Sequence, residues 1–209
     1  MNKTFLLTLI IVITLIFVVL IKKNKTNENS IVLKEDSVIL AFGDSLTLGY
    51  GAASDFSYPA YMQKKTGLHI INAGVNGEFS SEGLKRLPSF LEQKPDLVIL
   101  CHGGNDIINR RSAEDLKKNL LAMIDLIQKS GARVLFVGVP SFGLFGFDTH
   151  EVYVEVAEQR NVLYADDVIA NIQKDDSLKS DYVHPNKNGY EMMADNFISL
   201  LDLSKKESF

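Results

Sequence analysis

VILAFGDSLT, residues 38–47, is the stretch that decides the fold. Its first five residues, 38–42, are apolar and uncharged, and Gly43, Asp44 and Ser45, which favour a tight turn, follow at once. A continuous apolar run of this length is typical of a strand covered on both faces, as in a parallel sheet. The stretch therefore predicts a buried parallel strand that ends in a turn leading into a helix.

The same alternation of apolar run, glycine-rich junction and helical periodicity recurs along the chain. It is the signature of parallel βα units. Further strands are predicted at residues 69–72, 97–101, 133–139 and 162–165, and helices at 58–66, 81–93, 113–130, 149–160 and 186–203. The predicted fold class is α/β, a three-layer α/β/α sandwich with a flavodoxin-like five-stranded parallel sheet.

Length and charge exclude some classes of protein. With 209 residues, 46% of them apolar, the chain can bury one substantial core, and one globular domain is expected at residues 31–209. Four of the 22 basic side chains lie within residues 3–25, so the rest of the chain carries 18 against 26 acidic ones, a balance of −8. This charge repels polyphosphate, so no nucleic-acid partner is expected. The single cysteine, Cys101, rules out an internal disulfide and cysteine-cluster metal sites.

The amino terminus is predicted to anchor the chain in a membrane. Residues 5–21 carry no charge and, as a helix, span roughly 26 Å, the low end for crossing a bilayer. Because no small-x-small cleavage site follows, an anchor at residues 1–23 is favoured over a removed export signal, which would leave a secreted protein, and over a buried helix. Residues 24–30 suit a flexible tether. The charge is about +2 before the segment and +3 after it, a difference too small to decide how the segment is oriented in the membrane. Taken literally, it favours a cytoplasmic position for the domain that follows.

A nucleophile and its base are suggested by two separate stretches. Ser45 lies at a strand-to-helix turn, where its hydroxyl can project into the cleft, although Ser45, Asp44 or Thr47 could instead only cap a helix. His184 alone among the histidines lies in a polar loop before a helix, three residues after Asp181. That spacing lets Asp181 accept the Nδ1 proton and leaves Nε2 to take a proton from Ser45. We therefore expect Ser45, Asp181 and His184 to be catalytic.

Three N–H donors are available for an oxyanion hole at the same edge of the sheet. They are the backbone N–H of Ser45, the backbone N–H of Gly77 and the side-chain amide of Asn105. Each such donor fixed at the developing negative charge contributes about 3–4 kcal/mol to the transition state. Gly77 could instead be an ordinary turn glycine, and Asn105 an Asx-turn residue.

Residues 43–47, 72–77, 103–106 and 181–186 form four blocks, in order, at predicted strand ends or in the late loop. In these blocks the sequence resembles the SGNH, or GDSL-type, hydrolase family of serine esterases and lipases, notably bacterial thioesterase/lysophospholipases and arylesterases. The resemblance runs from about residue 38 to 197. It implies the SGNH hydrolase fold, hydrolysis of carboxylic esters or thioesters through an acyl-enzyme without metal or other cofactor, and a periplasmic or otherwise extracytoplasmic domain.

Two positions depart from the family pattern. Glu78 follows Gly77 where relatives often carry Asp and then Thr, and His102 stands where an aliphatic residue is common. His102 is expected to be a hydrogen-bonded structural histidine rather than a substrate ligand. Cys101 is expected to be a small buried strand residue.

A substrate-binding wall is predicted just past the fourth strand. The large apolar side chains there are separated by glycines, and with Asp44 they form the predicted substrate-binding set: Asp44, Phe142, Leu144, Phe145 and Phe147. Such a wall favours a fatty or aryl acyl group, because each buried methylene contributes about 0.8 kcal/mol. A small-molecule or lipid ester or thioester is the expected substrate, and ordinary packing under a loop is the alternative.

Two other functions stay open at this point. An O-acetylesterase acting on carbohydrate or peptidoglycan would use the same groups. A non-catalytic flavodoxin-like domain could bind a phosphate ligand through the same loops, but the sequence contains neither G-x-x-x-x-G-K-[ST] nor G-x-G-x-x-G, which disfavours a nucleotide. The sequence around Ser45 does not match the nucleophile motif G-x-S-x-G of α/β-hydrolases either, because Thr47 stands where that motif has its last glycine.

Overall fold

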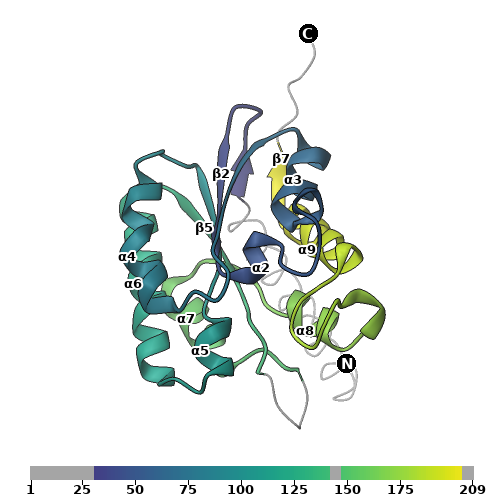
Figure 1. The fold of residues 1–209 in the computed structure, drawn as a ribbon. Coiled ribbons are helices and arrows are strands. Elements are labelled where there is room, and N and C mark those ends of the chain that lie inside the picture. The colour runs from purple at the N-terminus through teal and green to yellow at the C-terminus, as the bar shows by residue number, and fades with distance from the viewer. Residues whose placement is uncertain (1–30, 142–146, 204–209) are drawn as a thin grey trace, which may run out of the picture. The chain divides into compact units, whose positions relative to one another are not determined.

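A five-stranded parallel sheet forms the centre of the fold (Figure 1). Its strands lie in the order β3-β2-β4-β5-β6 and comprise β2 (Val38–Gly43), β3 (His69–Gly74), β4 (Leu97–Cys101), β5 (Arg133–Val137) and β6 (Leu163–Ala165). β4 is buried along its whole length, as its unbroken apolar sequence predicts. The predicted five-stranded sheet and its flavodoxin-like order are confirmed.

The structure, a computed structural model, describes residues 31–141 and 147–203. The chain separates into two units, Met1–Ser30 and Ile31–Phe209, and all described residues belong to the second. The predicted anchor and tether lie outside the described residues, as do Phe142, Leu144 and Phe145. Within the described ranges, no helix is both long enough and apolar enough to cross a membrane.

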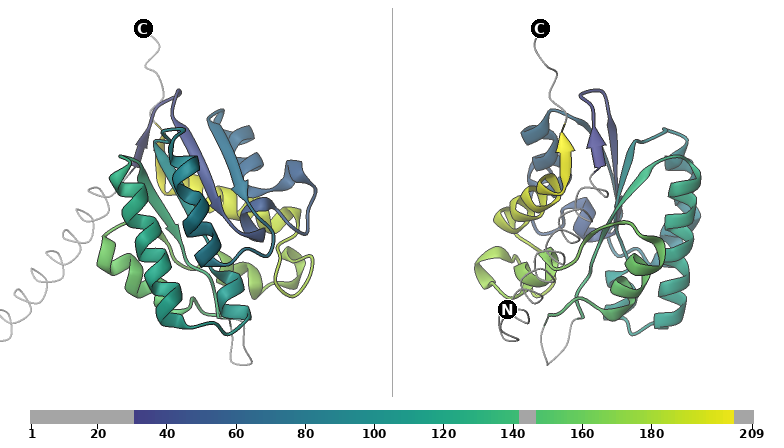
Figure 2. Two further views of the ribbon diagram at one scale, coloured as in Figure 1. Left: turned by 60° about the vertical axis from the view of Figure 1, so that its left-hand side comes forward. Right: turned by 180° about the vertical axis from the view of Figure 1, so that it is seen from behind.

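Helices cover both faces of the sheet, which gives the predicted three layers (Figure 2). One face carries α4 (Ser80–Leu91), α6 (Ala113–Lys129) and α7 (Glu151–Arg160), and the other carries α3 (Tyr58–Thr66), α8 (Val168–Gln173) and α9 (Lys187–Ser199). Shorter helical turns are α2 (Ser45–Leu48), η1 (Ser54–Phe56), α5 (Gly104–Ile108) and η2 (Asp176–Leu178).

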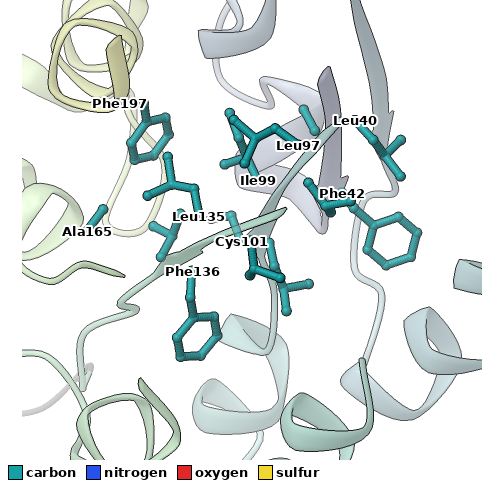
Figure 3. Close-up of a cluster of buried hydrophobic side chains, with 14 of the residues drawn as sticks. Leu40, Phe42, Leu97, Ile99, Cys101, Leu135, Phe136, Ala165 and Phe197 are labelled. Atoms are coloured by element: carbon teal, nitrogen blue, oxygen red, sulfur yellow. The ribbon is translucent and has the colours of Figure 1, made fainter. Parts of the chain in front are cut away.

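The core lies between the sheet and these two helical layers (Figure 3). Ile99 and Leu135 of neighbouring strands are fully buried, and Phe197 of α9 lies near them on one face while Phe136 points to the other. Burying each such side chain stabilises the fold by about 1.5–3 kcal/mol. The strand ends that carry the polar junctions are therefore held in a rigid frame.

A second, two-stranded sheet corrects the predicted last helix. Residues 186–203 were expected to be helical throughout, but α9 ends at Ser199 and Leu201–Leu203 forms β7. This strand pairs in parallel with β1 (Ile31–Leu33), with Ile31 opposite Leu201. Ile31 is buried. Each of these strands has only three residues, which is too short for an alternating pattern to show in the sequence, so neither was predicted.

Candidate active site

Ser45 is placed by the close approach of two strands. A Cβ on Gly43 would lie 1.9 Å from the carbonyl oxygen of Cys101 on β4, so only glycine fits where β2 ends. Asp44 then caps α2, because its carboxylate accepts the backbone N–H of Leu46 at 3.2 Å. Ser45 is thus the first residue of α2, 6% exposed. The chain turns sharply enough there to direct the serine out of the strand.

The three residues predicted to be catalytic come together. Nε2 of His184 lies 3.1 Å from Oγ of Ser45, across 139 residues of sequence. Nδ1 of the same ring lies 2.9 Å from Oδ2 and 3.0 Å from Oδ1 of Asp181. In the neutral imidazole, a proton on Nδ1 that the carboxylate accepts leaves Nε2 as an acceptor that faces the serine hydroxyl. The arrangement can transfer a proton from Ser45 to His184.

Asp181 is held as an anion by its own loop. Its Oδ1 accepts the backbone N–H groups of Val183 and His184, each at 2.8 Å. Partial burial acts to raise the pKa of Asp181, but these two donors and the imidazole of His184 outweigh it and lower the pKa below its ordinary value. The short loop therefore fixes both the charge of the carboxylate and the orientation of the ring.

A small cavity of about 110 Å³ opens beside the serine and the histidine. Its lining residues are Asp44, Ser45, Leu46, Asn76, Gly104, Asn105, Ile108, Val183 and His184. Asn105 thus faces the same space as Ser45, and its Nδ2 donates one hydrogen to the carbonyl oxygen of Glu78 at 2.9 Å. The amide group has a second hydrogen, which that bond does not use.

Gly77 lies in the loop that supplies the Glu78 carbonyl. The N–H of Glu78 donates to the carbonyl of Val75, which makes Asn76 and Gly77 the centre of a tight turn. Gly77 has φ +75° there, a conformation that glycine adopts without strain. Asn76 lines the cavity, whereas Gly77 is not among the residues lining it. The oxyanion role of the Gly77 N–H stays a prediction.

Two predicted substrate-binding residues are described, and neither has a side chain free of other contacts. Asp44 lines the cavity, but its second carboxylate oxygen accepts the N–H of Gly104 at 3.2 Å, so that it holds two loops together. Burial raises the pKa of Asp44, although His102 and its two backbone donors act to lower it. Phe147 packs against Tyr182, with ring centroids 6.0 Å apart.

Sequence reasoning missed the aromatic residue that supports the base. Tyr50 lies against the imidazole of His184, with ring centroids 4.5 Å apart, and its carbonyl oxygen accepts the hydroxyl of Tyr190 at 2.6 Å. Ile108, which adds an apolar wall to the cavity, was also missed. Neither residue belongs to a sequence motif with a chemical role, so only the fold identifies them.

The two residues interpreted as structural are buried. His102 is fully buried, and its Nε2 lies 2.9 Å from Oε2 of Glu78, which confirms a hydrogen-bonded histidine. Cys101 is also fully buried, and burial raises the pKa of its thiol. Among the described residues, no group of three or more His, Cys, Asp or Glu side chains is arranged to hold a metal ion.

The site thus combines a serine hydroxyl, an imidazole in contact with it and a carboxylate that orients the imidazole. These groups lie beside amide donors at the carboxyl edge of a parallel sheet, which is the arrangement of a serine hydrolase. Residues 41–192 match the model of the GDSL-like lipase/acylhydrolase family, and the chain belongs to this family.

Relatives of known name agree with this assignment. An arylesterase of Vibrio mimicus is 30% identical over 168 residues, which cover 75% of this chain and 84% of that protein. Thioesterase 1/protease 1/lysophospholipase L1 of Escherichia coli (strain K12) is 26% identical over 165 residues, 75% of this chain and 79% of that protein. The protein is an esterase of this family, and these relatives support hydrolysis of carboxylic esters or thioesters.

Solved structures agree as well. The psychrotrophic esterase EstA from Pseudoalteromonas sp. superposes with a TM-score of 0.70 at 25% identity, over 79% of this chain and 96% of that one. AlinE4, an SGNH-hydrolase family esterase, gives a TM-score of 0.60 at 29% identity, over 78% and 94% of the two chains. The SGNH hydrolase fold expected from the sequence is confirmed.

Proposed function

We propose that Ser45 attacks the acyl carbonyl of an ester or thioester with His184 as its general base and Asp181 as the group that orients the base. The 3.1 Å contact between Ser45 Oγ and His184 Nε2 carries this proposal. The Oγ–acyl bond forms as the Oγ proton moves to His184, and the protonated imidazole then gives that proton to the departing alcohol or thiol. Water, activated by His184, hydrolyses the acyl-enzyme and restores Ser45.

The negative charge that grows on the carbonyl oxygen needs fixed donors. We assign this role to the backbone N–H groups of Ser45 and Gly77 and to the unused Nδ2 hydrogen of Asn105. Support comes from Ser45 and Asn105 lining one cavity, and from the anchoring of the Asn105 amide on the Glu78 carbonyl. Donors held in place before the reaction cost no reorganisation when the charge develops.

The surroundings of the cavity favour an acyl group that extends beyond it. At about 110 Å³ the cavity holds the volume of only a few water molecules. Four large apolar side chains, at the ends of α2 and α5 and in the loops that follow α2 and β3, are 41–46% exposed: Leu48, Tyr50, Val75 and Ile108. Ile108 lines the cavity, and Tyr50 packs on His184, which also lines it. A medium or long acyl chain can lie over them, which fits a small-molecule or lipid ester better than an acetylated sugar.

The catalytic proposal is tested with Ser45→Ala on p-nitrophenyl esters. We expect turnover to disappear while the thermal unfolding temperature is unchanged, and labelling by a fluorophosphonate probe to be lost. Ser89→Ala, a change of the same kind at an exposed site on α4, is the control and keeps full activity. Unchanged turnover by the Ser45 variant would show that this serine is not the nucleophile. A wild-type protein that neither hydrolyses the esters nor reacts with the probe would instead support a non-catalytic binding domain.

The same esters, from acetyl to long acyl chains, test the substrate proposal. We expect kcat/KM to rise with chain length from acetyl onward, because each added methylene that leaves water contributes up to about 0.8 kcal/mol. The highest kcat/KM on acetyl would instead support the O-acetylesterase.

We also propose that residues 1–23 anchor the enzyme in a membrane, with the hydrolase domain on the extracytoplasmic side. The uncharged run at residues 5–21 and the lysines flanking it support the anchor, and the family resemblance supports the side. In membrane fractions, the full chain is expected to resist extraction by alkaline carbonate, whereas a chain starting at residue 27 is released. A full chain recovered in shortened form from the medium would indicate a cleaved signal instead.

A further inference from the structure

An ion cluster lies beside the predicted oxyanion donors and takes no part in the chemistry described so far. Arg86 of α4 donates two hydrogen bonds to the carboxylate of Glu78, from Nε to Oε1 at 2.6 Å and from Nη2 to Oε2 at 2.7 Å. Nε2 of His102 meets the same Oε2 at 2.9 Å. The three side chains are 20%, 7% and 0% exposed, respectively. A cluster so little exposed is screened weakly by solvent, and its geometry is fixed.

Arg86 also binds the ends of two strands. Its Nη2 also lies 3.0 Å from the carbonyl oxygen of Gly43 and 2.8 Å from that of Ala73, so that its two hydrogens are shared among these two oxygens and Oε2 of Glu78. Gly43 ends β2 just before Asp44 and Ser45, and Ala73 lies at the end of β3 before the turn that contains Gly77. The ring of Phe42 lies 4.0 Å from the guanidinium carbon. One side chain therefore fixes the loop of the nucleophile to the loop of the Gly77 donor.

Glu78 connects this cluster to two of the three predicted oxyanion donors. It directly follows Gly77, and its carbonyl oxygen accepts one Nδ2 hydrogen of Asn105 at 2.9 Å. A displacement of the Glu78 backbone would therefore move the Gly77 N–H and release the Asn105 amide. Asp106, next to Asn105, fixes the start of α4 separately, because its carboxylate accepts the N–H and the hydroxyl of Ser80 at 2.8 and 2.9 Å.

We propose that Arg86 is a positioning residue for the oxyanion hole: through the Glu78 carboxylate and the carbonyls of Gly43 and Ala73 it holds the predicted donors at the distance that the transition state requires. This inference rests on the proposed function, because the donors matter only if Ser45 attacks a carbonyl.

The packing around the cluster leaves it little freedom. Arg86, Glu78 and His102 are the charged or titratable side chains that meet there, and Gly83 of α4 faces them. A Cβ on Gly83 would lie 2.2 Å from Nε2 of His102, so the helix approaches the histidine closely. Lysine in place of Arg86 keeps the charge but cannot form the paired bonds to the carboxylate and also reach both carbonyls.

The test is a double-mutant cycle with Arg86→Lys and Asn105→Ala, read as kcat and KM on one p-nitrophenyl ester. Loss of an oxyanion donor in Asn105→Ala lowers kcat by about 100- to 1000-fold. If Arg86 acts through the donors, Arg86→Lys lowers kcat by about tenfold or more and leaves KM within about twofold. The double variant then loses clearly less than the product of the two single losses, because the part of the Arg86 effect that acts through Asn105 is already lost in Asn105→Ala.

Arg160→Met is the control, since it removes another arginine with two bonds to a carboxylate, that of Asp125 at 2.6 and 3.0 Å. It is expected to keep full kcat. Titration with the fluorophosphonate probe gives the active fraction of each variant, so a loss caused by misfolding is separated from a loss in kcat. If Arg86→Lys does not fold, Glu78→Gln replaces it in the cycle, and the same non-additivity is expected.

Three results would overturn the proposal. One is an unchanged kcat in Arg86→Lys or, where it is used instead, in Glu78→Gln. The others are a double variant whose loss in kcat equals the product of the two single losses, and an Asn105→Ala variant with full kcat. Ser45→Ala separates this failure from a failure of the proposed function. If Ser45→Ala and Asn105→Ala lose activity while Arg86→Lys keeps it, the hydrolase mechanism stands and only the positioning role is wrong.

Discussion

Replacing Asp181 with asparagine tests what the loop before His184 does. Oδ1 of Asp181 accepts two backbone N–H groups, those of Val183 and His184, at 2.8 Å each. An amide oxygen at this site can keep both bonds, so the loop is expected to keep its shape. The NH₂ group of the new side chain then takes the place of Oδ2, which lies 2.9 Å from Nδ1 of His184. A donor would thus replace an acceptor opposite the ring.

This exchange is expected to select the wrong tautomer of His184. Oδ1, 3.0 Å from Nδ1, already accepts two backbone N–H groups, so with a donor in place of Oδ2 we expect Nδ1 to accept. The ring proton then moves to Nε2 and points at Oγ of Ser45, 3.1 Å away. The base can then no longer take the serine proton. We expect kcat to fall by about four orders of magnitude, which corresponds to about 5.5 kcal/mol in activation free energy. Stability should change by less than about 1 kcal/mol, because the loop bonds remain.

The assay is p-nitrophenyl ester hydrolysis by Asp181→Asn, together with the rate of fluorophosphonate labelling and urea unfolding. Asp125→Asn, at a surface carboxylate paired with Arg160, is the control and should keep full activity. A variant that keeps more than about a tenth of kcat would refute the tautomer argument. A large loss of stability would refute the claim that the loop keeps its shape.

Three further outcomes are expected. First, burial acts to raise the pKa of Glu78, but His102 and Arg86 lower it below 4.5. Its carboxylate therefore stabilises the fold fully above pH 4.5 and loses this effect as the pH falls through the lowered pKa. The difference in free energy of unfolding between wild type and Glu78→Gln, measured in urea, should shrink below pH 4.5, and a constant difference would contradict this. Second, Gly83→Ala should lower the free energy of unfolding by about 1–3 kcal/mol, because the new Cβ would lie 2.2 Å from Nε2 of His102, although alanine is otherwise the better helix former. The assay is thermal unfolding, and a rise in Tm would show that α4 can move away from His102. Third, on β1, Ile31→Ala should lower the free energy of unfolding by about 2–4 kcal/mol and Val32→Ala by under about 0.5 kcal/mol, since their exposures are 1% and 58%; equal effects would contradict the burial of one side of this strand.

The main sheet could be predicted because its strands are apolar on both faces. Leu97–Cys101 matches the predicted strand residue for residue, and Tyr58–Thr66 matches the predicted helix, which a serine cap and Gly67 delimit. Predicted ends elsewhere differ by one to two residues, as for α4 and β5. Local signals of burial and capping are strong enough to define these elements.

The rest depends on contacts between residues far apart in sequence. β7 forms only because β1 offers it an edge, and a sequence window around residues 201–203 contains no information about residues 31–33. In the site, the spacing of Asp181 and His184 was readable because their contact is local, and a motif supplied Ser45. Tyr50 against His184 and Arg86 on two strand ends were not readable, because each contact joins separate loops through the tertiary fold.

The pairing of β1 with β7 has a consequence for how the chain is made. Ile31 leaves the ribosome early, but its partner Leu201 is synthesised almost last. Until then the first strand lacks the pairing with β7 that it has in the finished fold, where the side chains of Ile31 and Leu33 are 1% and 2% exposed. A chain that ended before residue 201 would keep the nucleophile loop but leave β1 without this partner, and an unpaired strand edge favours association with other chains.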